Sequence, residues 1–352
     1  MSQSLTTTEH LLETPRHRTA YLATGPEDGP LIVLVHGWPD LARSWRNQLA
    51  VLGALGFRAV APDMRGYGGS SVPASAAEYG QRQIVADMVE LIDHLGRERA
   101  IWVGHDWGAP VIWGMASHHP ERCRAVAGLS VPYYTLERGL APLIELVDRE
   151  LYPADRYPAG QWDYLLYYEE CFEAATATFE ANPRNTVKAL FRGGEPERAG
   201  KRAYTATIRE RGGWFGGRGE APDLPLDTSV LDQEELGSYV DALSRNGFAG
   251  PDSWYLNHEA NAAFAAEAVN GGRIEMPVLF MAGAYENTCE CTTSRLARPM
   301  GERCSDLTAT TIAAGHWMAL ERPAEVNAAL VGWLANRVGA LAGDPALPPL
   351  AV

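Results

Sequence analysis

Short apolar runs bounded by turn residues recur along this chain, and helical patterns lie between several of them. Runs of this length are typical of buried β-strands; they occupy residues 31–35, 58–61, 100–103, 125–129, 278–281 and 307–312. Apolar residues recur at three- and four-residue spacing over residues 83–95, as on one face of a helix, and again over residues 326–338. Alternating strands and helices predict an α/β fold with a mostly parallel, doubly wound sheet covered by helices on both faces.

The alternation stops after Val131 and resumes at Val278. Aromatic-rich helical patterns and a portion rich in Gly and Arg fill the interval. A structureless loop of that length is uncommon in a compact domain. We therefore predict an inserted helical cap (lid) domain over residues 133–273, and a core formed by residues 1–132 and 274–352.

The charge balance limits the partners that this chain can have. Lys and Arg total 30 and Asp and Glu total 44, which gives a formal net charge of −14 over 352 residues. An acidic field repels phosphate backbones and anionic lipids, so we expect neither a nucleic acid nor a membrane partner. Residues 1–18 lack the features of a secretory signal, and no apolar run approaches membrane-spanning length. We expect a cytoplasmic protein and leave its oligomeric state open, with a homodimer as the assembly to test.

Two local patterns resemble binding sites but lack a necessary part. Cys289, Cys291 and Cys304 could begin a metal site, yet no fourth ligand follows at the usual spacing, so we predict reduced thiols in a loop. Residues 212–217, Gly-Gly-Trp-Phe-Gly-Gly, could suggest a phosphate cradle, but no strand leads into them. We interpret this run as a flexible loop of the lid.

The sequence Gly104-His105-Asp106-Trp107-Gly108 follows a predicted strand and precedes a predicted helix. This is the strand–elbow–helix pattern of the G-x-S-x-G motif, with Asp106 in the place of the nucleophilic Ser. A carboxylate is charged at neutral pH and can attack an electrophilic carbon without a base. The product would be an ester on Asp106, which water must then cleave. A general base is therefore needed for the second step.

His316 follows the last predicted strand and is our candidate for that base. An imidazole can take a proton from water at neutral pH when a partner fixes its tautomer. Glu286, just after the strand over residues 278–281, is the candidate partner, with Glu290 as its rival. The chain order Asp106, Glu286, His316 is the order of a nucleophile–acid–histidine triad on this kind of sheet.

His36-Gly37-Trp38-Pro39 closes the strand over residues 31–35. A loop at this position can supply a backbone N–H to an oxyanion hole, together with the residue after the nucleophile. We therefore expect the backbone amides of Trp38 and Trp107 to hold the ester oxygen as it becomes negative.

Together the motifs resemble the soluble epoxide hydrolases of the α/β-hydrolase superfamily, from about Arg18 to Leu341. The matching segments are His36-Gly37-Trp38-Pro39, Arg65-Gly66-Tyr67-Gly68-Gly69-Ser70, Gly104-His105-Asp106-Trp107-Gly108 and Gly315-His316-Trp317. The resemblance implies an α/β-hydrolase fold with a cap, and conversion of a small apolar epoxide and water to a vicinal diol without metal or cofactor. One departure is Glu286, which stands where many members have Asp.

The resemblance also implies two lid tyrosines that donate hydrogen bonds to the epoxide oxygen. Tyr167 matches the first position and Tyr255 the second. Opening an epoxide releases an alkoxide, a poor leaving group, so a positioned phenol must share its proton. Tyr164 and Tyr168 lie on the same predicted helical face as Tyr167, and either could be the donor instead.

Other functions of the same fold fit less well. Haloalkane dehalogenases share the Asp elbow but usually carry Asn where Trp38 stands, and they lack the tyrosine pair. Fluoroacetate-type dehalogenases place Arg after the nucleophile, where this chain has Trp107. A ligand-binding protein that has lost its activity would have little reason to retain Asp106, Glu286 and His316 together. We therefore predict an epoxide hydrolase.

Overall fold

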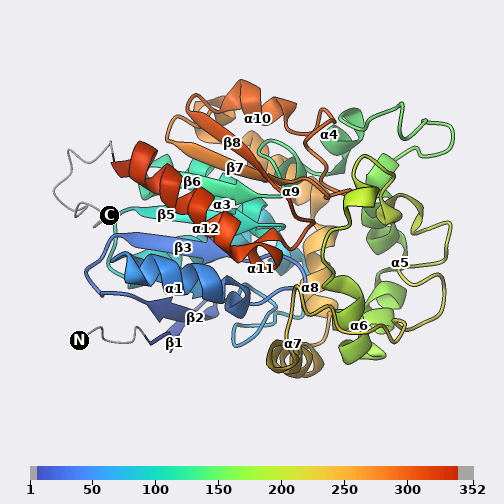
Figure 1. The fold of residues 1–352 in the computed structure, drawn as a ribbon, viewed down its shortest axis with the longest axis horizontal. Coiled ribbons are helices and arrows are strands. Elements are labelled where there is room, and N and C mark those ends of the chain that lie inside the picture. Colours follow the sequence, from blue (N-terminus) through green and yellow to red (C-terminus); the bar gives the residue numbers. More distant parts are fainter. Residues whose placement is uncertain (1–5, 340–352) are drawn as a thin grey trace.

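The computed structural model describes residues 6–339, and within this range the chain forms one eight-stranded sheet in the order β1-β2-β4-β3-β5-β6-β7-β8 (Figure 1). The strands are β1 (Thr8–Glu13), β2 (Arg18–Thr24), β3 (Leu31–Val35), β4 (Arg58–Pro62), β5 (Ala100–His105), β6 (Cys123–Leu129), β7 (Val278–Gly283) and β8 (Leu307–Ile312). The strands from β3 to β8 pair in parallel, whereas β1 and β2 form an antiparallel edge. The predicted fold class is confirmed. The strands β1 and β2 were not predicted, because their sequences hold no continuous apolar run.

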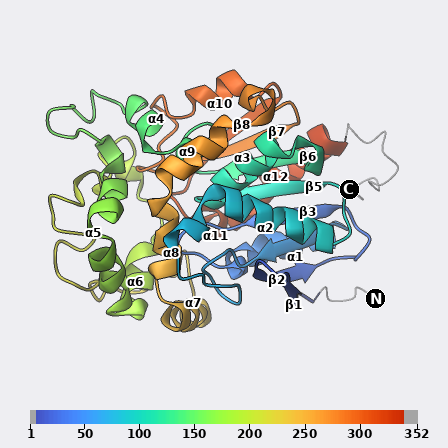
Figure 2. The same cartoon turned by 180° about the vertical axis from the view of Figure 1, so that it is seen from behind.

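Helices cover both faces of the sheet (Figures 1 and 2). One face carries α1 (Arg46–Ala54), α11 (Met318–Glu321) and α12 (Pro323–Trp333), and the other carries α2 (Gln81–His94), α3 (Gly108–His118) and α9 (His258–Ala266). Side chains on a strand alternate between the two faces. Accordingly, Val33 and Val35 of β3 pack into the core on the α2 side, while Ile32 and Leu34 pack into the core on the α12 side.

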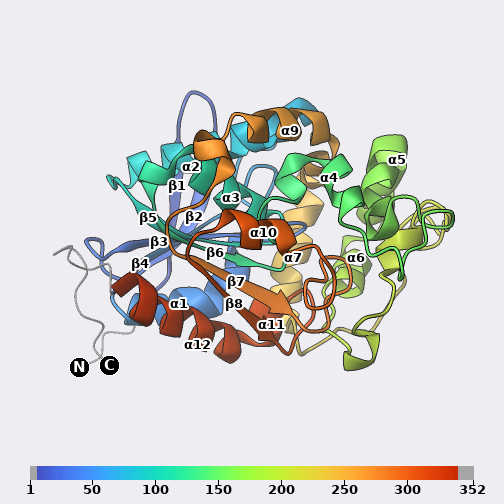
Figure 3. The same cartoon turned by 90° about the horizontal axis from the view of Figure 1, so that it is seen from above.

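The chain between β6 and β7 is helical, as predicted for the interval between these strands. It contains α4 (Leu140–Glu145), α5 (Asp163–Glu180), α6 (Pro183–Leu190), α7 (Gln233–Asn246), α8 (Ala249–Ser253) and α9. Helices α5 and α6 lie together at one end of the molecule, beyond the sheet (Figures 1 and 3). Helix α9 instead packs on α2, and Phe264 stacks on His118 with ring centroids 3.8 Å apart.

The division into core and cap at residues 133 and 273 thus remains a prediction, and α9 of this interval packs with the core. The outer ends of the predicted core, residues 1–5 and 340–352, lie outside the described residues. A short helix, α10 (Arg298–Arg303), connects β7 to β8. None of the helices within residues 6–339 combines the length and apolar character needed to cross a membrane.

The parallel arrangement explains where the chemistry gathers. The carboxyl ends of parallel strands meet at one edge of a sheet. Trp38 follows β3, Asp106 follows β5, Glu286 follows β7 and His316 follows β8. Residues that are far apart in the sequence are therefore brought to the same edge.

Candidate active site

Asp106 lies at the tip of a sharp turn between β5 and α3. Its φ of 51° is in the left-handed region, which is uncommon for a residue other than Gly. The turn brings Gly108 against β3, so that a β-carbon at Gly108 would lie only 2.1 Å from the carbonyl oxygen of Val35. The helix can start this close to the strand only because residue 108 has no side chain. The elbow therefore presents the Asp106 carboxylate at the edge of the sheet.

The structure brings Asp106, His316 and Glu286 together. His316 Nδ1 lies 2.8 Å from Glu286 Oε2, and His316 Nε2 lies 3.6 Å from Asp106 Oδ2. The carboxylate of Glu286 can only accept, so Nδ1 donates to it and the imidazole is held in one orientation. Glu290, the rival acid, instead accepts hydrogen bonds from its own turn, including the amides of residues 292–294.

Both carboxylates shape the charge of the imidazole. Burial by itself lowers the pKa of His316, but the charges of Glu286 and Asp106 and the hydrogen bond to Glu286 outweigh it and raise the pKa to about 9. Burial also opposes ionisation of Glu286, yet the His316 charge and two backbone amides hold its pKa below the ordinary value. At neutral pH this raised pKa favours the protonated form of His316.

The loop of His316 is fixed by a second histidine. His105, the last residue of β5, donates from Nε2 to the backbone carbonyl of His316 at 2.7 Å. Burial lowers the pKa of His105 to about 3, so its ring is neutral and can hold this donor position. The predicted motif Gly-His-Asp thus supplies both the nucleophile candidate and a support for the base candidate.

Two backbone amides hold the carboxylate of Asp106. The Trp38 amide donates to Oδ1 at 2.6 Å, and the Trp107 amide makes a second hydrogen bond to the same carboxylate. A β-carbon at Gly37 would lie 2.3 Å from Oδ1, so this residue lets the loop approach. Burial raises the pKa of Asp106, although the His316 charge and both amides oppose the rise. The two amides that we predicted to form an oxyanion hole therefore both donate to the carboxylate of Asp106.

A cavity of about 210 Å³ opens above the carboxylate. Its wall holds several aromatic rings and all three members of the triad. The lining residues are Trp38, Asp106, Tyr164, Leu190, Arg192, Thr205, Trp214, Tyr255, Glu286, Thr288, Cys289, His316 and Trp317. A concave, mostly apolar site with a few convergent polar groups is typical of small-molecule binding.

Comparison with known proteins identifies the family of this chain. The family model of the alpha/beta hydrolase fold matches residues 30–323. Epoxide hydrolase A of Mycobacterium tuberculosis (strain ATCC 25618 / H37Rv) is 36% identical over 93% of this chain and 97% of its own length. Bifunctional epoxide hydrolase 2 of Sus scrofa is 33% identical over 92% of this chain, which spans only 54% of the pig protein. The crystal structure of Epoxide Hydrolase A from Mycobacterium thermoresistibile is similar with a TM-score of 0.76 and 34% identity, covering 94% of this chain and 99% of that one.

This chain belongs to the epoxide hydrolases of the α/β-hydrolase superfamily. The resemblance of its motifs to that family is thereby confirmed. The roles of individual residues are a separate question, because the comparisons name proteins and do not assign positions.

The epoxide hydrolase resemblance matched Tyr167 and Tyr255 to the two donors, and the structure brings Tyr255 and Tyr164 to the cavity instead. Tyr164 and Tyr255 are the lining tyrosines among the described residues, with ring centroids 5.7 Å apart. Tyr167 lies toward the backbone of Gly213, where a β-carbon would be 2.7 Å from its hydroxyl.

Other aromatic residues surround or line the cavity. Trp162, Tyr168 and Trp254 are buried in the packing around it and are not among its lining residues in the described range. Trp214 lines the cavity and stacks on Trp38 with centroids 5.7 Å apart. It belongs to the Gly-rich run 212–217, which we had interpreted only as a flexible loop. The pair Trp214-Phe215 inside this run of glycines is the sequence feature that could have indicated a role for Trp214 in the cavity.

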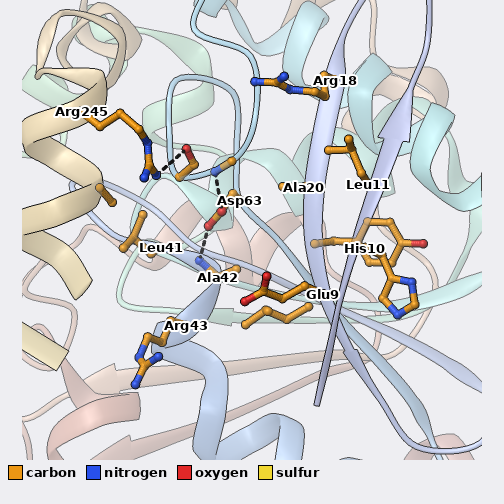
Figure 4. Close-up of a pocket in the computed structure, with 15 residues that line it drawn as sticks. Glu9, His10, Leu11, Arg18, Ala20, Leu41, Ala42, Arg43, Asp63 and Arg245 are labelled. Carbon is orange, nitrogen blue, oxygen red and sulfur yellow. Dashed lines mark hydrogen bonds between the residues drawn. The ribbon is translucent and has the colours of Figure 1, made fainter. Parts of the chain in front are cut away.

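A larger cavity of about 740 Å³ lies between the β1–β2 edge and α7 (Figure 4). Within the described residues its wall holds no member of the triad. Two of the polar groups shown there already have protein partners: the Asp63 carboxylate accepts from the amides of Ala42 and Gly69, and Arg245 donates to the Gly68 carbonyl. Chemistry rather than size therefore identifies the smaller cavity as the candidate active site.

The cysteines form no disulfide: Cys123, Cys171, Cys289, Cys291 and Cys304 are all free. Over residues 6–339 no group of three or more His, Cys, Asp and Glu side chains is arranged to hold a metal ion. Cys289 lines the cavity beside the triad, and burial raises the pKa of its thiol well above the ordinary value. The thiol is therefore protonated and acts there as a small apolar surface.

Proposed function

We propose that this protein hydrolyses a small apolar epoxide to a vicinal diol through a covalent ester on Asp106. One observation carries the proposal: Asp106 at the elbow and the two tyrosines Tyr164 and Tyr255 line the same aromatic cavity. A nucleophile on one side of an epoxide and two proton donors on the other are what ring opening requires.

In the first step Asp106 Oδ2 attacks a ring carbon, and the bond from that carbon to the epoxide oxygen breaks. The oxygen takes a proton from Tyr164 or Tyr255. Burial, together with the nearby Asp106 charge, raises the pKa of both phenols well above the usual value, so both are protonated donors before the reaction. Their protons become transferable when the oxygen turns into a strongly basic alkoxide.

The ester changes the electrostatics around His316. Alkylation removes the negative charge of Asp106, which is one of the influences that raise the pKa of His316. The pKa of His316 therefore falls, and the imidazole can lose its proton and act as a base. This order explains how one histidine is a cation during the attack and a base afterwards.

In the second step water adds to Cγ of Asp106 and gives a proton to His316 Nε2. Oδ1 becomes negative, and the amides of Trp38 and Trp107 already point at this carboxylate. The bond from Cγ to Oδ2 then breaks, and His316 returns the proton to the diol oxygen. The carboxylic acid that remains on Asp106 releases its proton to restore the tyrosine, and His316 takes back from solvent the proton that it released before the second step, so the balance is epoxide plus water to diol.

A second candidate activity is release of halide from a haloalkane. The Trp107 indole N–H is buried without a hydrogen-bond partner in the described part of the chain, and such a group could bind a halide. A halide site needs a second N–H donor. The Trp38 indole does not supply it, because it donates to Asp252 at 2.9 Å. We therefore favour the epoxide.

The covalent route is tested by the source of the diol oxygen. With excess enzyme in H₂¹⁸O and one turnover, the diol should stay unlabelled while Asp106 gains the label, because the transferred oxygen is Oδ2. A His316→Gln variant should hold the ester, seen as a protein mass increase equal to the epoxide. A labelled diol in the first turnover, or an inactive His316→Gln protein of unchanged mass, would contradict the route. A haloalkane assayed in parallel for halide tests the second candidate.

A further inference from the structure

Asp252 is a fully buried carboxyl group that the mechanism above does not use. It lies in α8, three residues before Tyr255, and its exposed fraction is 0%. Its Oδ1 accepts from the Trp38 indole Nε1 at 2.9 Å, and its Oδ2 bonds the Thr176 hydroxyl at 2.9 Å. A buried polar group costs free energy unless such partners are present. The position therefore calls for an explanation.

The contacts of Asp252 join three separate parts of the chain. Trp38 belongs to the loop after β3, Thr176 belongs to α5, and Asp252 itself belongs to α8, which leads directly into Tyr255. The Trp38 ring also packs against Tyr255, with centroids 5.7 Å apart. The carboxyl thus fixes the Trp38 side chain relative to one of the two phenol donors.

The same Trp38 supplies a backbone donor to the reacting carboxylate. Its amide lies 2.6 Å from Asp106 Oδ1, and the Trp38 side chain that Asp252 holds begins one bond from that peptide unit. The Trp38 ring is packed against Phe179, Trp214 and Tyr255, so a displacement of the ring after loss of its anchor at Nε1 would shift Cα through Cβ and carry the amide away from Oδ1. An oxyanion hole works because its donors are in place before charge develops.

We infer that Asp252 is a positioning residue: through the Trp38 indole it holds the Trp38 amide on Asp106 Oδ1 for cleavage of the ester. This inference rests on the proposed function. The amide also stabilises the resting carboxylate, so its loss does not slow the attack on the epoxide. Loss of the amide contact does slow the second step, because Oδ1 becomes negative in that step. Asp252 therefore acts on one half-reaction.

The experiment compares both half-reactions in matched variants. Asp252→Leu removes both contacts at similar size. Asp252→Asn retains them, because the amide oxygen accepts from Trp38 and the amide nitrogen donates to Thr176. Thr176→Val removes only the second contact. With styrene oxide as the probe, stopped-flow tryptophan fluorescence gives the rate of ester formation, and quenched single turnovers with intact-protein mass give the rate of its cleavage.

In Asp252→Leu we expect ester cleavage to slow by about 10- to 100-fold while ester formation stays within about threefold, since loss of a whole oxyanion-hole donor costs about 10²–10³-fold. The alkylated protein should then accumulate during turnover. Asp252→Asn should restore cleavage to within about threefold of the native rate, and Thr176→Val should stay close to it.

A readout independent of turnover accompanies the kinetics. The indole ¹⁵N–¹H resonance of Trp38, assigned by its loss in Trp38→Phe, should exchange slowly with solvent in the native protein and in Asp252→Asn, and quickly in Asp252→Leu. Equal slowing of both half-reactions, failure of Asn to restore cleavage, or unchanged cleavage in Asp252→Leu would each overturn the inference while the native enzyme still forms its ester. Absence of any ester on native and His316→Gln protein would instead overturn the proposed function, and the inference with it.

Discussion

The charge switch at His316 can be measured directly in a variant that lacks the nucleophile. Asp106→Ala removes the negative charge that alkylation would remove. His316 Nε2 lies 3.6 Å from Asp106 Oδ2. For unit charges at that separation, Coulomb's law gives about 1 kcal/mol in water and about 5 kcal/mol at an effective dielectric constant of 20. At about 1.4 kcal/mol per pKa unit, the charge of Asp106 is worth roughly one to three units.

The pKa of His316 is raised to about 9 in the native protein. In Asp106→Ala we therefore expect it at about 6 to 8, which would allow the imidazole to act as a base at neutral pH. Two-bond ¹H–¹⁵N NMR of the ring nitrogens, recorded from pH 5 to 10, measures the pKa and the tautomer. Glu290→Gln is the control: it removes a carboxylate that hydrogen-bonds its own turn, and the pKa of His316 should not change. A pKa unaltered by Asp106→Ala would refute the switch.

The same raised pKa predicts how stability depends on pH. A group whose folded-state pKa lies above its unfolded value stabilises the fold fully below the unfolded pKa, and the effect is lost as pH rises through the folded pKa. For His316 the window runs from about 6.5 to about 9, and the difference corresponds to about 3 kcal/mol. Urea unfolding across this window should show a decline in the free energy of unfolding that is smaller in His316→Gln. An identical decline in both proteins would contradict the assignment.

Two further predictions use matched pairs of side chains. Tyr255→Phe should slow ester formation by about 10²-fold, because a proton donor at the departing oxygen is lost, while Tyr167→Phe should stay within about threefold; stopped-flow measurement of ester formation checks both, and the reverse ranking would restore Tyr167 to the site. Glu286→Gln should lower the pKa of His316 and slow ester cleavage by at least about tenfold, whereas Glu290→Gln should leave cleavage unchanged; equal effects of the two substitutions would mean that the acid has been misassigned.

The triad could be located from sequence because each member follows a strand. Asp106 and Glu286 come just after apolar runs that form buried strands, whereas His316 follows β8, an edge strand that we predicted as buried but whose residues are mostly half-buried or exposed; all three parallel strands end at one edge of the sheet. The elbow needs Gly104 and Gly108, where a β-carbon would clash with backbone atoms, and that requirement is visible as a residue type. These local signals depend on backbone geometry and burial, which short sequence patterns encode directly.

Sequence position alone could not show which two tyrosines line the cavity. Tyr164, Tyr167 and Tyr168 share one helical segment, and spacing says only that they lie near one face. Which of them meets the cavity depends on the rotation of α5 against α8 and on the packing of Trp214. Asp252 was equally hidden, because its partners Trp38 and Thr176 are distant in sequence.

The order of residues along this chain determined by itself an α/β sheet, the elbow with a carboxylate at its tip, and the imidazole that follows the last strand, because periodicity and turn residues act over a few positions. The tertiary structure alone decided which tyrosines line the cavity with Asp106, that His316 lies between two carboxylates, and that a buried acid holds the Trp38 ring. These properties depend on distances between segments brought together only by folding, and both electrostatic and hydrogen-bond energies change steeply over an ångström or two.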